Sequence, residues 1–125
     1  MCVKSSFSRE DCNVFVISTD NEAFCLTTEE YAQFKADGKI REAVCGRSTL
    51  LLRNGVQLDQ SSSTMPAATM EPRTAIGVSQ DGKTVYLMVV DGRNFYYSNG
   101  ADLYDLMNLM SACGAGDALN LDGGG

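Results

Sequence analysis

The sequence contains no histidine, and this absence removes several kinds of active site. A catalytic triad or a zinc site that relies on imidazole is excluded. The five cysteines include no C-x-x-C pair, which argues against a zinc ribbon or a redox motif. Because their number is odd, they are also a poor basis for a disulfide framework. We interpret them as small, buried, apolar residues.

Positive charge is scarce as well. Lysine and arginine total 10 against 16 aspartates and glutamates, so the net charge is -6. Binding to a nucleic-acid backbone needs clustered cations, so nucleic acid is not an expected partner. No apolar run approaches the roughly 20 residues of a membrane span. No apolar stretch follows Lys4, so no signal peptide is visible, and the sequence gives no compartment.

What is present predicts one globular domain over residues 1–125. Hydrophobic residues make up 44% of the chain, enough for one core. We expect a first strand over residues 13–18, followed by a helix. Thr27 with Glu30 is a capping-box pattern for the start of that helix, and Gly38 marks its end. Asn54-Gly55 between apolar runs predicts a hairpin. Residues 59–72 are polar and small, which predicts a long surface loop.

The second half of the chain has a more regular pattern. Two strands are expected around a second hairpin turn at Asp81-Gly82. Residues 101–113 predict a helix that Gly114 ends, and residues 117–121 predict a final short strand. The buried stripe of the helix is expected to consist of Leu103, Leu106, Met107 and Met110.

Strand spacing brings distant residues together. A two-residue turn at 81–82 places Arg73 opposite Val90 and Pro72 opposite Asp91. Strand, loop, helix and strand then follow within residues 84–121, which is the length of a β-α-β crossover. The strands ending at Asp91 and Asp122 should therefore be parallel. The fold class we predict is α+β, with a mixed β-sheet and helices packed on it.

This arrangement predicts a ligand site at one edge of the sheet. Ligands bind outside the carboxyl ends of parallel strands, where Asp91 and Asp122 fall. Arg73 and Arg93 fall at the same edge, and a guanidinium group suits a phosphate or carboxylate. The glycines after Asp122 allow bare amides to face an anion. The alternative is that the arginines and aspartates form structural ion pairs, and that Asn120 only completes strand hydrogen bonds.

Two segments of the second half of the chain also resemble a known family. "PRTAIGVSQDGKTVYLMVVDGR" and "GADLYDLMNLMSACGAGDALNLDGGG" are similar to the phosphodiester glycosidases, the family of the mannose 6-phosphate uncovering enzyme and many bacterial relatives. The resemblance is specific over residues 72–125, where P-R-T-A-x-G, D-G-R and N-L-D-G-G-G occur in order. "AVCGRSTLLLRNGV" resembles the preceding family segment more loosely.

The resemblance implies a hydrolase that cleaves a sugar phosphodiester of the N-acetylglucosamine-1-phosphodiester type. It implies that an arginine holds the phosphodiester charge and that a carboxylate acts as acid, base or nucleophile at the anomeric carbon. Asp122 is our first choice for that carboxylate and Asp91 our second. The motif positions expected to bind substrate are Arg73, Thr74, Arg93, Asn120, Gly123, Gly124 and Gly125.

Two departures from the family pattern qualify the expectation of activity. The family continues after D-G-G-G with serine and threonine residues, and it has an upstream N-G-G-F-F-like segment; neither is in this sequence. We therefore expect a partial domain, and whether this chain alone is an enzyme is left open. The alternatives are a non-catalytic module that binds a sugar phosphate or glycan, and an inactive fragment that self-associates through open sheet edges.

No cofactor is implied. Asp91, Asn120 and Asp122 offer oxygen ligands suited to calcium, but no loop has the spacing of an EF-hand. Members of the family are commonly exported, but the sequence of this chain does not indicate its own localisation.

Overall fold

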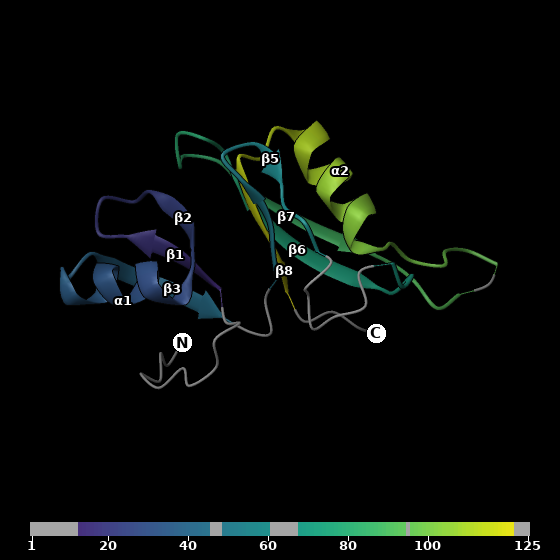
Figure 1. The fold of residues 1–125 in the computed structure, drawn as a ribbon, viewed down its shortest axis with the longest axis horizontal. Coiled ribbons are helices and arrows are strands. Elements are labelled where there is room, and N and C mark those ends of the chain that lie inside the picture. The colour runs from purple at the N-terminus through teal and green to yellow at the C-terminus, as the bar shows by residue number, and fades with distance from the viewer. Residues whose placement is uncertain (1–12, 46–48, 61–67, 95, 122–125) are drawn as a thin grey trace.

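The computed structural model describes residues 13–45, 49–60, 68–94 and 96–121. These residues form eight strands and two helices, which confirms the predicted α+β class. The strands make two separate sheets, each covered by one helix (Figure 1).

The smaller sheet is built from the first part of the chain. It contains β1 (Val14–Ser18), β2 (Ala23–Leu26) and β3 (Ile40–Cys45) in the order β2-β1-β3, and both pairs are antiparallel. The strand expected over residues 13–18 is therefore confirmed, whereas β2 and β3 were not predicted. Side chains alternate between the two faces of this sheet, so it has apolar contacts on both sides.

Helix α1 (Thr28–Ala36) covers one face of the small sheet and has the predicted ends. The Thr27 hydroxyl accepts from the Glu30 amide at 3.3 Å, and the Glu30 carboxylate accepts from the Thr27 amide at 3.1 Å. Gly38 follows the C-cap with φ at 67°, a left-handed conformation that suits glycine. The capping box is thus confirmed.

The larger sheet holds β4 (Thr49–Arg53), β5 (Val56–Gln57), β6 (Arg73–Val78), β7 (Val85–Val90) and β8 (Asp117–Leu121). Its strand order is β5-β4-β8-β6-β7. The predicted hairpin at residues 54–55 joins β4 to β5. Both turn residues have positive φ, at 52° for Asn54 and 79° for Gly55, as a primed turn requires.

The register predicted for β6 and β7 is confirmed. Arg73 lies opposite Val90, and the pairing continues to Val78 opposite Val85. The turn itself is wider than expected. It spans residues 79–84, with the Gly82 amide donating to the Ser79 carbonyl at 3.0 Å and the Ser79 amide donating to the Thr84 carbonyl at 2.9 Å. The wider loop keeps the register because Ser79 still lies opposite Thr84.

The predicted crossover over residues 84–121 is present, but the two strands that it connects are not adjacent in the sheet. Strands β7 and β8 are both antiparallel to β6, which lies between them, so they run parallel to each other without sharing hydrogen bonds. Every strand pair described in the larger sheet is antiparallel, whereas a mixed sheet contains parallel pairs as well. The two carboxyl ends nevertheless reach the same edge.

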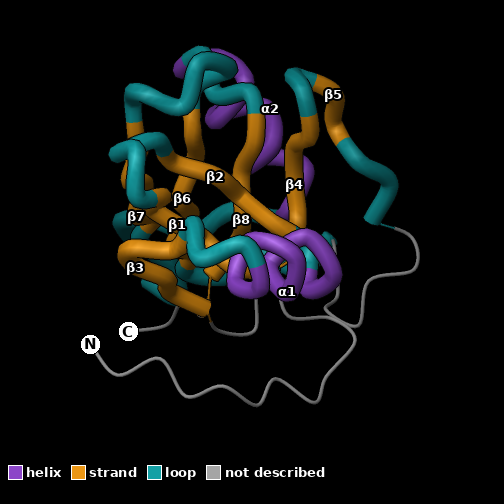
Figure 2. The backbone as a smooth tube through the Cα atoms, turned by 90° about the vertical axis from the view of Figure 1, so that its left-hand side faces the viewer, coloured by secondary structure: helices purple, strands orange, loops and turns teal. Residues whose placement is uncertain are grey.

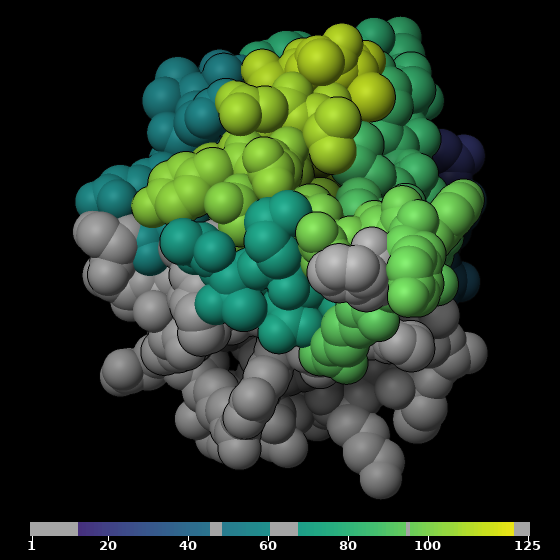
Figure 3. All heavy atoms as spheres, turned by 90° about the vertical axis from the view of Figure 1, so that its right-hand side faces the viewer, coloured from purple at the N-terminus to yellow at the C-terminus, as the bar shows by residue number. Residues whose placement is uncertain are grey.

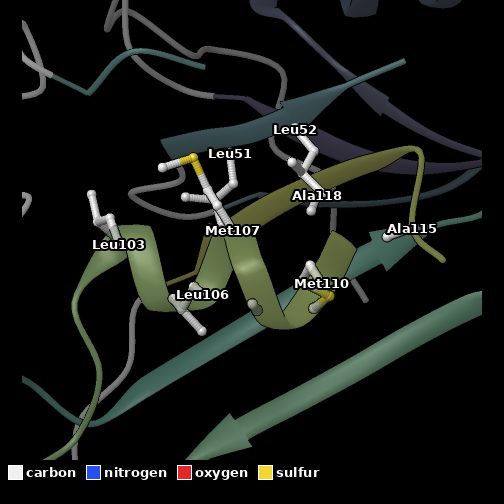
Figure 4. Close-up of a cluster of buried hydrophobic side chains, with 9 residues drawn as sticks. Leu51, Leu52, Leu103, Leu106, Met107, Met110, Ala115 and Ala118 are labelled. Atoms are coloured by element: carbon white, nitrogen blue, oxygen red, sulfur yellow. The ribbon is translucent and has the colours of Figure 1, made fainter. Parts of the chain in front are cut away.

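Helix α2 (Leu103–Cys113) packs on one face of the larger sheet. Its predicted stripe of Leu103, Leu106, Met107 and Met110 is fully buried, with at most 1% of each residue exposed. Figure 4 shows these side chains meeting Leu51, Leu52 and Ala118 from β4 and β8. Asp102 caps the helix start, and Gly114 ends it with φ at 97°.

The two sheets pack on each other through the faces that the helices leave uncovered. Phe15 and Cys25 of the small sheet share one apolar cluster with Ile76 and Leu119 of the large sheet. The layers therefore run α1, small sheet, large sheet, α2 (Figure 1), and Figure 2 looks at this stack from the side of α1. Because α2 occupies one face and the small sheet the other, the ends of the large sheet are where a site can open.

Candidate functional site

One edge of the large sheet gathers three strand ends. Strand β6 begins there at Arg73, β7 ends there at Val90, and β8 ends there at Leu121, which lies opposite Thr74. This is the edge at which the sequence analysis placed the site. The chain leaves β7 into residues 91–102, a loop that extends away from the sheet before α2 begins (Figure 1).

A pocket of about 260 Å³ lies at this edge. Its polar lining residues are Arg73, Thr74, Asp91 and Asn94. Its other lining residues are Pro72, Val89, Val90, Gly92 and Tyr97. Figure 3 shows this end of the molecule, with the loop after β7 beside the segment that leads into β6. The pocket thus brings together three of the residues predicted for the site: Arg73, Thr74 and Asp91.

Arg73 is held in place by backbone carbonyl groups. Its Nε donates to the Ala101 carbonyl at 3.0 Å, and its Nη2 donates to the Thr69 carbonyl at 2.8 Å. The residue is only 5% exposed. Within the described part of the chain, the third nitrogen, Nη1, makes no hydrogen bond, and Arg73 is among the residues that line the pocket.

The environment of Arg73 acts on the pKa of its guanidinium group in two opposite ways. Burial lowers the pKa of its guanidinium group, while the nearby Glu71 and Asp102 carboxylates act in the opposite direction. A guanidinium stays protonated in proteins at neutral pH. Arg73 is therefore a buried, positively charged residue in the lining of a pocket that Asp91 also lines.

Arg93 is arranged differently. Its Nε and Nη2 both donate to Oε2 of Glu71, at 2.9 and 2.6 Å, and its side chain is 62% exposed. It is not among the described residues that line the pocket. The structure therefore contains an ion pair at Arg93, but its partner is Glu71 and not one of the aspartates that the sequence alternative named. A role for Arg93 in substrate binding stays a prediction.

Two glycines allow the walls of the pocket to come together. A Cβ atom on Gly92 would lie 2.7 Å from the Pro72 nitrogen, and one on Gly100 would lie 2.3 Å from the Glu71 carbonyl oxygen. Glu71 also exchanges backbone hydrogen bonds with Ala101, at 3.2 and 3.0 Å. The loop after β7 is thus fastened to the segment preceding β6, and this closeness requires residues without side chains.

The remaining predicted residues lie elsewhere or outside the described residues. Asn120 is fully buried in β8, opposite Ala75 on β6, and does not line the pocket. Asp122 and the glycines at 123–125 lie outside the described residues, so their predicted roles are untested. The shared edge explains why the sequence pattern grouped Asn120 with the site, since it is one residue from the end of its strand.

Sequence reasoning missed Asn94 and Tyr97. Both come from the loop after β7, which we treated only as the connection to the next helix. The signal that was available is an Asn-x-x-x-Ser spacing with two tyrosines inside a polar loop, because asparagine side chains often organise such turns.

Metal and membrane features are both missing from the described residues. They bring together no group of three cysteine, aspartate or glutamate side chains that could hold a metal ion. Neither α1 nor α2, the helices of the described chain, has the length and apolarity needed to cross a bilayer. One of the three residues considered for calcium, Asp122, lies outside the described residues.

Solved structures share this fold. The catalytic domain of zebrafish N-acetylglucosamine-1-phosphodiester alpha-N-acetylglucosaminidase, auto-inhibited by its pro-peptide, superposes with a TM-score of 0.73 at 22% identity, over 90% of this chain and 40% of that one. A hypothetical protein from Synechocystis gives a TM-score of 0.50 at 19% identity, over 92% of this chain and 28% of that one. This chain therefore spans well under half the length of either structure. No curated protein sequence matches it.

The family assignment comes from the sequence itself. Residues 4–125 match the phosphodiester glycosidase family, which is nearly the whole chain. The match extends the resemblance from residues 72–125 to the N-terminal part that the motifs did not identify. The chain belongs to the phosphodiester glycosidase family.

Proposed function

We propose that this protein takes part in cleaving a phosphodiester of an N-acetylglucosamine-type sugar, with the phosphate held in the pocket at the edge of the large sheet. The observation that carries the proposal is that Arg73 and Asp91 line the same pocket. In the described chain, Nη1 of Arg73 makes no hydrogen bond. A guanidinium group offers the positive charge and the N–H donors that a phosphodiester needs.

The family name and the name of the zebrafish relative supply the reaction type. In glycoside hydrolysis, a carboxylic acid protonates the leaving oxygen while a second carboxylate activates water or attacks the anomeric carbon. We assign these roles to Asp122 and Asp91, with Asp122 as first choice. Thr74 and Arg73 position the phosphate, the glycines at 123–125 complete the binding site, and Asn120 supports the site from within β8. Arg93 supports the wall through Glu71.

A second candidate function is supported by one observation. Asp91 is the single carboxylate among the described residues that line the pocket, whereas glycosidases usually need two. A module that binds a sugar phosphate without cleaving it requires only the arginine and a sugar contact. The same experiment separates the two functions.

The test is the release of N-acetylglucosamine from its methyl α-1-phosphodiester. Wild-type protein should release the sugar, and Asp122→Asn and Asp91→Asn should each lower kcat by about a hundredfold or more, the range expected for loss of an acid-base group. Asn is close to Asp in size, so folding should be retained. Hydrolysis that survives both substitutions would contradict the proposed roles. Binding without hydrolysis in the wild type would favour the binding module.

A further inference from the structure

Two neighbouring tyrosines differ in their relation to the pocket. Tyr96 is 96% exposed and Tyr97 is 78% exposed, and both follow β7 in the same loop. Tyr97 lines the pocket, whereas Tyr96 is not among the described lining residues. A single exposed tyrosine is ordinary on a protein surface. Tyr97, however, is both largely exposed and part of the lining of a pocket that Arg73 also lines. A ligand in that pocket can therefore cover its ring.

The loop holds Tyr97 in a fixed position. The Tyr97 amide donates to the Asn94 carbonyl at 3.1 Å, and the amides of Asn94 and Ser98 each donate to the other residue's carbonyl, at 3.0 and 2.9 Å. The Ser98 hydroxyl donates to the Asp91 carbonyl at 2.6 Å, which ties the turn to the end of β7. Because the backbone around Tyr97 is already ordered, binding a ligand against its ring costs less conformational entropy.

The pocket lining is divided by chemistry. Arg73, Thr74 and Asp91 supply charge and hydrogen-bonding groups, whereas Pro72, Val89 and Tyr97 supply apolar surface. Val89 is 74% exposed although it is a β-branched apolar residue in a strand. A free inorganic anion would use the first set only. A ligand that matches both sets carries an anionic group attached to a body with an apolar face and a polar rim.

A pyranose phosphodiester has this division. One face of a pyranose ring presents C–H groups, which pack against the electron-rich face of an aromatic ring, while its hydroxyls point outward at the rim. We propose that Tyr97 is the residue on which the sugar of the phosphodiester stacks, with the phosphate directed to Arg73. This inference rests on the proposed function and adds the specificity determinant: the substrate must carry a pyranose ring next to its phosphate.

The experiment compares two ligands that share the phosphodiester and differ in the sugar. The ligands are the methyl α-1-phosphodiester of N-acetylglucosamine and dimethyl phosphate, titrated by calorimetry into wild type, Tyr97→Ala, Tyr97→Phe and Tyr96→Ala. Tyr96→Ala is the matched control, because it removes the same side chain one position away. All variants change exposed side chains, and circular dichroism with a melting curve verifies their folding.

The expected result is selective. Wild type should bind the sugar diester more tightly than dimethyl phosphate, and Tyr97→Ala should weaken binding of the sugar diester by about tenfold, which is at the low end of the loss measured when a nucleobase loses its aromatic stacking partner. Dimethyl phosphate binding should be unchanged in Tyr97→Ala. Tyr97→Phe and Tyr96→Ala should bind the sugar diester like wild type, since stacking needs the ring and not the hydroxyl.

Three results would overturn the inference: equal affinity of wild type for the two diesters, no effect of Tyr97→Ala, or equal losses in Tyr97→Ala and Tyr96→Ala. Failure of the proposed hydrolysis looks different. In that case the sugar diester binds with the predicted dependence on Tyr97, and no N-acetylglucosamine is released.

Discussion

At the scale of single residues, two arginines of one sheet edge have different surroundings. Arg73 is 5% exposed and donates to two carbonyl groups, whereas the side chain of Arg93 is 62% exposed and pairs with Glu71. Sequence spacing brought both to the edge but could not separate them. The difference arises from Thr69 and Ala101, whose carbonyls approach Arg73 only in the folded chain.

This difference predicts unequal losses of stability. Arg73→Ala should lower the free energy of unfolding by about 2–3 kcal/mol, because it removes charge-assisted hydrogen bonds to carbonyl groups in a buried setting. Arg93→Ala should change it by at most about 1 kcal/mol, as is usual for an exposed ion pair. Urea denaturation measures both values. Equal losses in the two variants would mean that Arg73 is not the anchored residue we describe.

The cysteines also separate by environment. Cys25 is fully buried, which confirms the sequence interpretation for that residue, whereas Cys113 is exposed, and there the interpretation is wrong. Burial, followed by the Asp117 charge, raises the pKa of the Cys25 thiol to about 12, with Arg53 acting the other way. The thiol is therefore protonated and shielded at neutral pH.

Cysteine labelling follows from this. At pH 8, iodoacetamide should modify Cys113 in the folded protein and leave Cys25 unmodified, as peptide mass spectrometry would record. The folded state also holds the Cys25 proton more tightly than the unfolded chain does. Its contribution to stability is complete below the unfolded pKa of about 8.5 and is lost as the pH rises towards the folded value. Rapid labelling of Cys25 in the folded state would contradict this environment.

At the scale of elements, the sequence predicted those that carry local signals. The capping box of α1, the stripe of α2 and the β6–β7 register depend on residues a few positions apart, and all three are present. Strands β2 and β3 were missed for opposite reasons. Strand β2 has only four residues between a turn and a helix cap, and the second and third residues of β3, Arg41 and Glu42, are both exposed and charged, which hides its alternation.

The site was predictable only in part for the same reason. Arg73 and Asp91 line the same pocket because of the strand register, which a hairpin turn fixes locally. The close approach of the loop to the Glu71-Pro72 backbone is a long-range contact, so the roles of Gly92 and Gly100 could not be inferred beforehand. Likewise, the packing of the two sheets depends on Phe15 meeting Ile76, which no local pattern indicates.

Gly100 gives a test of that loop. Its φ is 99°, and an added Cβ would lie 2.3 Å from the Glu71 carbonyl oxygen. Gly100→Ala should therefore lower the free energy of unfolding by at least about 2 kcal/mol, combining backbone strain with displacement of the loop. Gly38→Ala is the matched control. Gly38 also has positive φ but faces open space, so its loss should be about 1 kcal/mol. Similar losses in the two variants would contradict the tight loop contact.

At the scale of the whole molecule, the large sheet has an open side at β7. Among the described strands, β7 pairs only with β6, and it exposes Val85, Leu87 and Val89 on the face away from α2. Leu87 is 78% exposed and Val89 is 74% exposed. These exposed side chains of β7 are therefore the surface at which we expect two copies to meet if the chain self-associates through an open sheet edge.

Leu87→Lys tests this surface. If two copies meet at β7, the charge should shift sedimentation equilibrium towards monomer, because charged side chains on edge strands oppose pairing. Leu109→Lys is the control, since Leu109 is also exposed but lies on α2. A wild type that is monomeric at high concentration, or equal effects of the two substitutions, would contradict association through β7.

The central claim is that a sugar phosphodiester binds at the edge where β6 begins and β7 ends. The most direct measurement is a titration of the methyl α-1-phosphodiester of N-acetylglucosamine, followed by amide chemical shifts in two-dimensional NMR. The largest shifts among the described residues should fall at Arg73, Thr74, Asp91, Asn94 and Tyr97, with little change at the opposite end of the sheet around Arg53 and Asp117. Shifts centred on Arg53 and Asp117, or no saturable shifts at all, would contradict this claim.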